Sequence, residues 1–186
     1  MPISFDDIPK LFKKDKSVEE ALKRYFKVVE KKEKPKFRAL GKEILLEKEK
    51  QAEEIIKACR LCERRCGVNR QRWEKGYCQL GTEMQISSFF EHHGEEQFFM
   101  HSFSVFFWSC NSDCQYCQNW KISQRKETGS KMKEEELAET IDEHAVNCKN
   151  LSLTGGEPTL QIHNILKTLS EVKSDIPVIL NSNFYM

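Results

Sequence analysis

The sequence predicts an α/β protein whose main strands pair in parallel. From about residue 103, short apolar segments alternate with amphipathic segments of helical length. Strands separated by helices of this length pair in parallel through right-handed crossovers. The 186 residues are enough for one domain with a small extension. We therefore expect an α/β core that follows a helical N-terminus and a cysteine-rich segment.

Residues 1–58 are expected to form a charged helical extension. The segment Ser17–Glu20 has the pattern of a capping box, and apolar residues at helical spacing follow it as far as Val29. Pro35 interrupts this pattern, and a second helix is expected from about residue 37 to residue 58. We interpret the lysine and glutamate runs as a solvated helix face. A binding arm for an acidic partner is the alternative interpretation.

Residues 59–82 are expected to form a small metal-binding segment. The start of the chain has no continuous apolar run, which predicts that there is no signal peptide and that the protein is cytoplasmic. Structural disulfides are rare in that reducing compartment, so clustered cysteines indicate metal ligands. The four cysteines here are Cys59, Cys62, Cys66 and Cys78. A closed zinc site and an auxiliary iron–sulfur cluster both fit their spacing, and the choice stays open.

Five arginines surround this first cysteine group. They are Arg60, Arg64, Arg65, Arg70 and Arg72. We expect them to offset the negative charge of the thiolates, and a basic patch for RNA or a phosphorylated substrate is the alternative. The net charge of +1 gives no general argument for a nucleic-acid partner. No apolar run approaches the roughly 20 residues that a bilayer-spanning helix requires, so no membrane role is expected.

Residues 83–186 are expected to form the core, which we predict element by element. Two short β-type runs, at about 84–88 and 97–101, flank a polar segment at Glu91–Gly94. The expected strands and helices then follow in the order strand 103–108, helix 133–146, strand 151–153, helix 160–172 and strand 177–180.

A second cysteine group follows the first of these buried strands. Cys110, Cys114 and Cys117 have the spacing CxxxCxxC. Parallel sheets carry their sites at the carboxyl ends of the strands, so the location favours chemistry. Three thiolates can hold three irons of a [4Fe–4S] cluster and leave the fourth open, whereas electron-transfer clusters use four cysteines. The segment Gly155-Gly156-Glu157-Pro158 follows the next strand.

These two motifs resemble those of the radical S-adenosylmethionine (SAM) superfamily. The resemblance implies that Cys110, Cys114 and Cys117 ligate the cluster. It also implies that the open iron binds SAM, whose reductive cleavage gives methionine and a 5′-deoxyadenosyl radical that abstracts hydrogen from a substrate. Two sets of residues would then lie near the SAM ligand. They are Gly155, Gly156 and Glu157 at its amino-acid end, and Asn181 and Ser182 at the same rim after the third strand.

The first cysteine group extends the resemblance toward one subgroup. With Gly67-Val-Asn-Arg70 and Gly76-Tyr-Cys78, it is similar to the segment before the core in proteins related to pyruvate formate-lyase activating enzyme. By analogy, the substrate would be a glycine in a protein partner, and the reductant a protein of the ferredoxin or flavodoxin type.

The resemblance also implies the architecture of the core. Radical SAM cores are partial parallel barrels of six βα units, and about three units, the first half, fit into residues 83–186. The third strand would leave an unpaired edge. We therefore expect the chain to be a fragment, with completion by another chain as the alternative.

Two other functions fit parts of the sequence. One is a non-catalytic iron–sulfur electron carrier with two clusters, and the other is a zinc-knuckle module that binds nucleic acid. The glycine-rich segment at residues 155–158 favours the radical SAM enzyme over both. The absence of an evident fourth cysteine beside Cys110, Cys114 and Cys117 disfavours the electron carrier.

Overall fold

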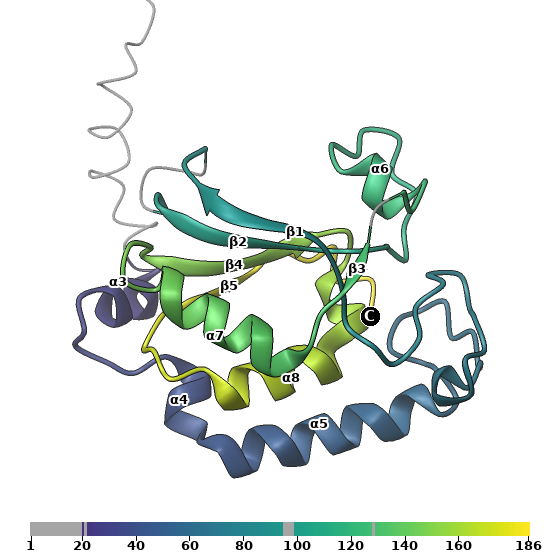
Figure 1. The fold of residues 1–186 in the computed structure, drawn as a ribbon, viewed down its shortest axis with the longest axis horizontal. Coiled ribbons are helices and arrows are strands. Elements are labelled where there is room, and N and C mark those ends of the chain that lie inside the picture. Colours follow the sequence, from purple (N-terminus) through teal and green to yellow (C-terminus); the bar gives the residue numbers. More distant parts are fainter. Residues whose placement is uncertain (1–19, 21, 95–98, 128) are drawn as a thin grey trace, which may run out of the picture.

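The computed structural model describes residues 20, 22–94, 99–127 and 129–186, and it shows a mixed α/β fold (Figure 1). Five strands form one sheet in the order β3-β1-β2-β4-β5. The strands are β1 (Gln85–His92), β2 (Ser102–Phe107), β3 (Ser130–Lys131), β4 (Asn150–Gly155) and β5 (Val178–Leu180). The helices are α3 (Lys23–Val29), α4 (Lys36–Leu40), α5 (Lys42–Ile56), α6 (Trp120–Ser123), α7 (Glu134–His144) and α8 (Ile162–Glu171), with short 3-10 turns η2 (Arg70–Arg72) and η3 (Pro158–Gln161).

The parallel half of the sheet is the one that the sequence predicted. Strand β2 pairs in parallel with β4, and β4 pairs in parallel with β5. The crossover from β2 to β4 contains α7, and the crossover from β4 to β5 contains α8. Strand β1 adds an antiparallel half, because it pairs with both β2 and β3 in the opposite direction. The mixed α/β sheet is compatible with part of a radical SAM barrel.

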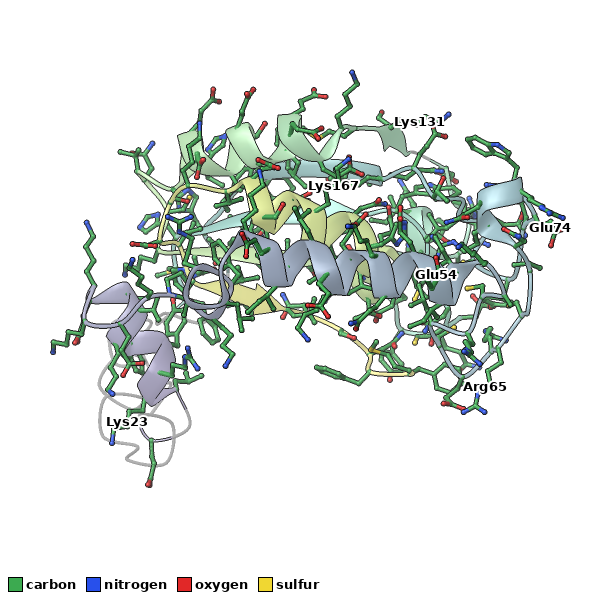
Figure 2. All side chains as sticks on the ribbon, turned by 90° about the horizontal axis from the view of Figure 1, so that it is seen from below. Lys23, Glu54, Arg65, Glu74, Lys131 and Lys167 are labelled. Carbon is green, nitrogen blue, oxygen red and sulfur yellow. The ribbon has the colours of Figure 1, made fainter. Side chains whose placement is uncertain are left out.

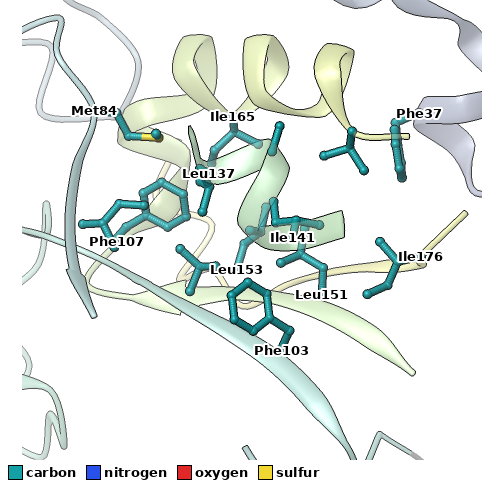
Figure 3. Packing of buried hydrophobic residues seen from close by; sticks show 14 of the residues in the cluster. Phe37, Met84, Phe103, Phe107, Leu137, Ile141, Leu151, Leu153, Ile165 and Ile176 are labelled. Carbon is teal, nitrogen blue, oxygen red and sulfur yellow. The ribbon is translucent and has the colours of Figure 1, made fainter. Parts of the chain in front are cut away.

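The helices of the core cover one face of the sheet. Helices α7 and α8 pack against this face, and α5 packs on the outer side of α8 (Figure 1). Apolar residues of the strands alternate with small polar ones, so that Phe103 and Phe107 point to the helices, whereas Ser104 points away. Figure 3 shows Phe103, Leu151 and Leu153 of the sheet against Leu137, Ile141 and Ile165 of the helices. This packing fixes the strands whose loops carry the candidate site.

Two expectations for the first hundred residues need correction. The second predicted helix is divided into α4 and α5 at Gly41, whose φ of +84° is unfavourable for other residues. The β-type run at 97–101 is not a strand over residues 99–101. There the Phe99 carbonyl accepts hydrogen bonds from the side chains of Ser102 and Asn150, whereas in a strand it would accept one from a backbone N–H of the neighbouring strand. The proposed capping residue Ser17 lies outside the described residues.

Among the described residues, no helix combines the length and the apolar character that crossing a bilayer requires.

Candidate functional site

The loops that follow the three parallel strands meet at one edge of the sheet. The loop after β2 carries Asn111 and Ser112, and the segment after β5 carries Asn183. The Asn183 Nδ2 donates hydrogen bonds to Asn111 Oδ1 at 2.8 Å and to Ser112 Oγ at 3.2 Å. In return, Asn111 Nδ2 donates to the carbonyl oxygen of Tyr185 at 3.0 Å. The parallel pairing therefore brings the predicted segments together, as expected for carboxyl ends of adjacent strands.

Glu157 connects the loop after β4 to the segment after β5. Its side chain is completely buried. Its Oε1 accepts hydrogen bonds from Thr159 N at 3.0 Å, Thr159 Oγ1 at 2.6 Å and Ser182 Oγ at 2.9 Å, and its Oε2 accepts one from Asn183 N at 2.8 Å. A buried carboxylate requires such donors, because burial without them is very unfavourable. Glu157 therefore holds two of the three loops in place.

The two glycines of this segment allow backbone to contact backbone. Gly155 has a φ of +103°, a conformation that L residues rarely adopt. A Cβ on Gly156 would lie 1.8 Å from the carbonyl oxygen of Ser109. The Gly156 and Glu157 amides donate to the carbonyls of Phe107 and Ser109, each at 2.8 Å. The glycine-rich loop is thus packed directly on the residue that precedes Cys110.

The three cysteines after β2 differ in environment. Cys110 is buried, and its Sγ accepts hydrogen bonds from Ser112 N at 3.4 Å and Asn183 Nδ2 at 3.7 Å. Burial raises the pKa of the Cys110 thiol, and the Ser112 amide only partly opposes this. Cys117 Sγ lies 3.3 Å from Ser123 Oγ, and Cys114 is exposed.

The described residues contain no group of three or more cysteine, histidine, aspartate or glutamate side chains placed close enough to hold a metal ion. This applies to both cysteine groups, so both ligand sets remain predictions. The donor set nevertheless fits an iron–sulfur cluster, because thiols on one loop with N–H donors aimed at a sulfur suit thiolate ligands. We name residues 110–117 the cluster loop.

The other predicted residues lie at the same edge. Asn181 Nδ2 donates to Ser152 Oγ at 2.9 Å, so its side chain lies on the β4 strand. The Ser182 hydroxyl donates a hydrogen bond to the Glu157 carboxylate, as described above. Asn183 and Asn119 were not predicted as site residues. Asn119 Nδ2 donates to the Gly155 carbonyl at 3.0 Å and so joins the glycine-rich loop to α6. The sequence offered one signal for each residue. Asn183 comes soon after the third predicted parallel strand, and Asn119 comes soon after the CxxxCxxC motif.

The first cysteine group lies beside this edge, at the end of α5. Figure 2 shows Arg65 and Glu74 of this segment at the same end of the molecule as Glu54 of α5, far from Lys23. A cavity of about 10 Å³ is lined by all four cysteines of the group. They are Cys59, Cys62, Cys66 and Cys78. We call residues 59–82 the cysteine knuckle.

Cys78 is the member of this group whose acidity is most clearly perturbed. Burial raises the pKa of the Cys78 thiol, and the Leu80 amide and the Arg70 charge oppose this rise without cancelling it. The nearby Cys59 and Cys62 raise the pKa further.

The comparison with known families covers the part of the chain that carries these loops. Residues 105–186 match the family model of the Radical SAM superfamily. The matched radical SAM segment contains the cluster loop, the glycine-rich loop and the residues after β5. Members of this superfamily are generally enzymes, and the superfamily implies a [4Fe–4S] cluster and SAM as cofactors. The cysteine knuckle lies outside the matched residues.

One curated relative matches a larger part of the chain than the family model does. An uncharacterized protein of Methanocaldococcus jannaschii is 40% identical over 141 residues, which are 73% of this chain and 41% of the relative. The chain therefore spans less than half the length of this relative. No solved structure gives a match.

Proposed function

We propose that this chain carries the SAM-cleaving site of a radical SAM enzyme. The observation that supports this most strongly is the joining of three loops at one sheet edge by Glu157 and Asn183. All three loops lie within the segment that matches the superfamily. When bound, a [4Fe–4S] cluster with an open iron supplies the electron that cleaves SAM into methionine and a 5′-deoxyadenosyl radical.

The residues of the chain have distinct tasks in this proposal. Cys110, Cys114 and Cys117 hold the cluster, and the donors to Cys110 Sγ support its thiolate form. Gly155 and Gly156 line the amino-acid end of SAM, because the absence of their side chains lets this loop pack directly on the backbone that precedes Cys110. Asn181 and Ser182 complete the rim after β5. Glu157 lies behind this rim, where its carboxylate holds the loops rather than facing outward.

The finer parts of the proposal rest on the resemblance of the cysteine knuckle to activating-enzyme-related proteins. We propose a glycine in a protein partner as the substrate and a ferredoxin or flavodoxin as the reductant. We also propose that the knuckle cysteines hold a second metal. The supporting observation for this last point is that all four line one cavity.

Product analysis tests the central proposal. The chain is reconstituted anaerobically with iron and sulfide, reduced with dithionite and mixed with SAM, and 5′-deoxyadenosine and methionine are quantified by chromatography. We expect both products in equal amounts, and a loss of at least tenfold in Cys117→Ala. Cys148→Ala is the matched control, because Cys148 is buried in the core away from both cysteine groups. Intact SAM in a preparation whose cluster is present and reduced would refute the proposal and favour an electron carrier.

A further inference from the structure

We infer that the cysteine knuckle binds a single zinc ion and that this ion braces the cluster loop. The four possible ligands, Cys59, Cys62, Cys66 and Cys78, line one cavity of about 10 Å³. A cavity of this size holds about one water molecule, and an ion bound by four sulfurs at roughly 2.3 Å needs no more. The zinc ion specifies the second metal proposed above and does not depend on SAM cleavage, whereas its effect on the cluster loop rests on the proposed radical SAM site.

The backbone of the knuckle directs its cysteines toward this cavity through tight turns. The Cys59 amide donates to the Val68 carbonyl at 2.9 Å, and the Gly67 amide donates to the Cys59 carbonyl at 3.0 Å. The Arg65 amide donates to the Cys62 carbonyl at 2.9 Å and closes the first turn. These hydrogen bonds fold the segment into a closed loop in which Cys59 lies beside Gly67 and Val68.

A second turn carries the fourth cysteine. Gln79, with a φ of +61°, follows Cys78, and its amide donates to the Gly76 carbonyl at 3.1 Å. Gly76 leaves no room for a side chain, because its Cβ would lie 2.9 Å from Cys66 Sγ. The two turns therefore meet at Gly76 and Cys66, and their cysteines line the cavity beside this contact. Four cysteines on two turns are the ligand set of a tetrahedral thiolate site, and binding of the ion would draw their sulfur atoms together.

Arg70 provides an independent observation that points to an anionic site. Only 1% of Arg70 is exposed, and its side chain lines the same cavity. Its guanidinium donates only to carbonyl oxygens, namely Gly81 O at 2.9 Å and 2.5 Å and Leu160 O at 2.8 Å. Among the described residues, no carboxylate forms an ion pair with it. A buried cation needs a compensating charge, and Zn²⁺ with four thiolates carries a net charge of −2.

The knuckle is bonded directly to the residues on both sides of Cys110. Ser109 Oγ donates to the Cys78 carbonyl at 2.5 Å, and Arg64 Nε donates to the Asn111 carbonyl at 2.6 Å. The Arg64 guanidinium also lies 3.4 Å from the centre of the Tyr77 ring. An ion bound by the two knuckle turns would therefore also hold Arg64 and Cys78 in place. These two residues bond to Asn111 and Ser109 at the start of the cluster loop. Loss of the ion should loosen the site of the proposed radical SAM cluster.

The first experiment tests the knuckle metal without the radical SAM cluster. In a chain in which Cys110, Cys114 and Cys117 are all replaced by alanine, Co²⁺ is titrated and the absorption spectrum is recorded. We expect one Co²⁺ per chain, with the charge-transfer and d–d bands of a tetrahedral thiolate site, and displacement by one Zn²⁺. Further replacement of Cys59 and Cys78 by serine should abolish these bands, whereas Cys148→Ser should retain them.

Three outcomes of this experiment would overturn the zinc assignment. They are the absence of Co²⁺ binding, bands that persist without Cys59 and Cys78, and iron with acid-labile sulfide in the knuckle of the purified triple variant. A chain that binds one zinc but cleaves no SAM would refute the proposed function and leave the zinc site intact.

The second experiment tests the brace in the chain with all its cysteines. Arg64→Met leaves every knuckle ligand in place and removes the hydrogen bond to Asn111 together with the guanidinium contact on the Tyr77 ring. We expect it to retain one zinc, to reconstitute less [4Fe–4S] and to show an altered EPR spectrum of the reduced cluster. Arg72→Met, in the same segment, is the control, because the Arg72 side chain is exposed. If Arg64→Met matches wild type in iron content and EPR spectrum, the inference that the knuckle stabilises the cluster loop is wrong.

Discussion

At the scale of single residues, the site depends on contacts that exclude a side chain. Gly156 lies where the loop after β4 meets the Ser109 carbonyl, and the space there is smaller than a methyl group needs. Glu157, the next residue, is completely buried and binds the loops after two strands. Gly156 thus lets the loop after β4 approach Ser109, and Glu157 connects that loop to the segment after β5.

Gly156→Ala should therefore disrupt the cluster loop. Its Cβ would lie 1.8 Å from the Ser109 carbonyl oxygen, so one of the two loops must move. We expect the free energy of unfolding to fall by about 1–3 kcal/mol, as in overpacked sites, and SAM binding to weaken at least tenfold. Urea denaturation and equilibrium dialysis with labelled SAM measure the two effects.

Gly81→Ala is the matched control for this substitution. A Cβ on Gly81 would lie 3.2 Å from Lys75 Nζ, which is the end of a flexible side chain that can move. We expect stability and SAM binding close to those of wild type. Equal behaviour of Gly156→Ala and Gly81→Ala would contradict the proposed packing of the glycine-rich loop.

At the scale of elements, α8 is held to the segment before β1 by a polar contact, in addition to the packing of its apolar face. His163 in its first turn is buried, and its Nε2 donates to the Thr82 carbonyl at 2.9 Å. Burial, and secondarily the charge of Arg70, lowers the pKa of His163 to about 4. The folded chain therefore keeps this imidazole neutral at a pH where the unfolded chain, with an ordinary pKa near 6.5, is protonated.

This difference predicts a loss of stability in mild acid. Since the unfolded state binds the proton first, the free energy of unfolding falls as the pH falls from about 6.5 toward 4. Between pH 7 and pH 5, wild type should lose about 2 kcal/mol more than His163→Gln, whose amide can still donate to Thr82. Urea denaturation of both proteins at the two pH values measures this difference. Parallel losses in the two proteins would show that His163 is not the responsible group.

At the scale of the whole molecule, helices cover one face of the sheet and the candidate loops collect at its carboxyl edge (Figure 1). The three parallel strands could be predicted, because their apolar runs are short and separated by amphipathic helices. The meeting of the cysteine and glycine motifs followed from that topology, since parallel strands end at the same edge.

Other features of the molecule could not be predicted from local patterns. Strand β1 is longer than its apolar run, and it includes the polar pair Glu91 and His92 because β2 satisfies its backbone. Strand β3 has two residues, too few for any periodicity. The role of Asn183 depends on a loop 72 residues earlier in the chain, with which its side chain forms a hydrogen bond. Such contacts depend on tertiary structure, which residue spacing does not reveal.

The most direct test of the central claim is EPR spectroscopy of the reduced, reconstituted chain with and without SAM. If Cys110, Cys114 and Cys117 hold a [4Fe–4S] cluster with one open iron, SAM must bind that iron and change the spectrum. We predict a clear change in g values and line shape on addition of SAM, and its loss in Cys114→Ala but not in Cys148→Ala. An identical spectrum with and without saturating SAM, in a chain that carries a complete reduced cluster, would contradict the account.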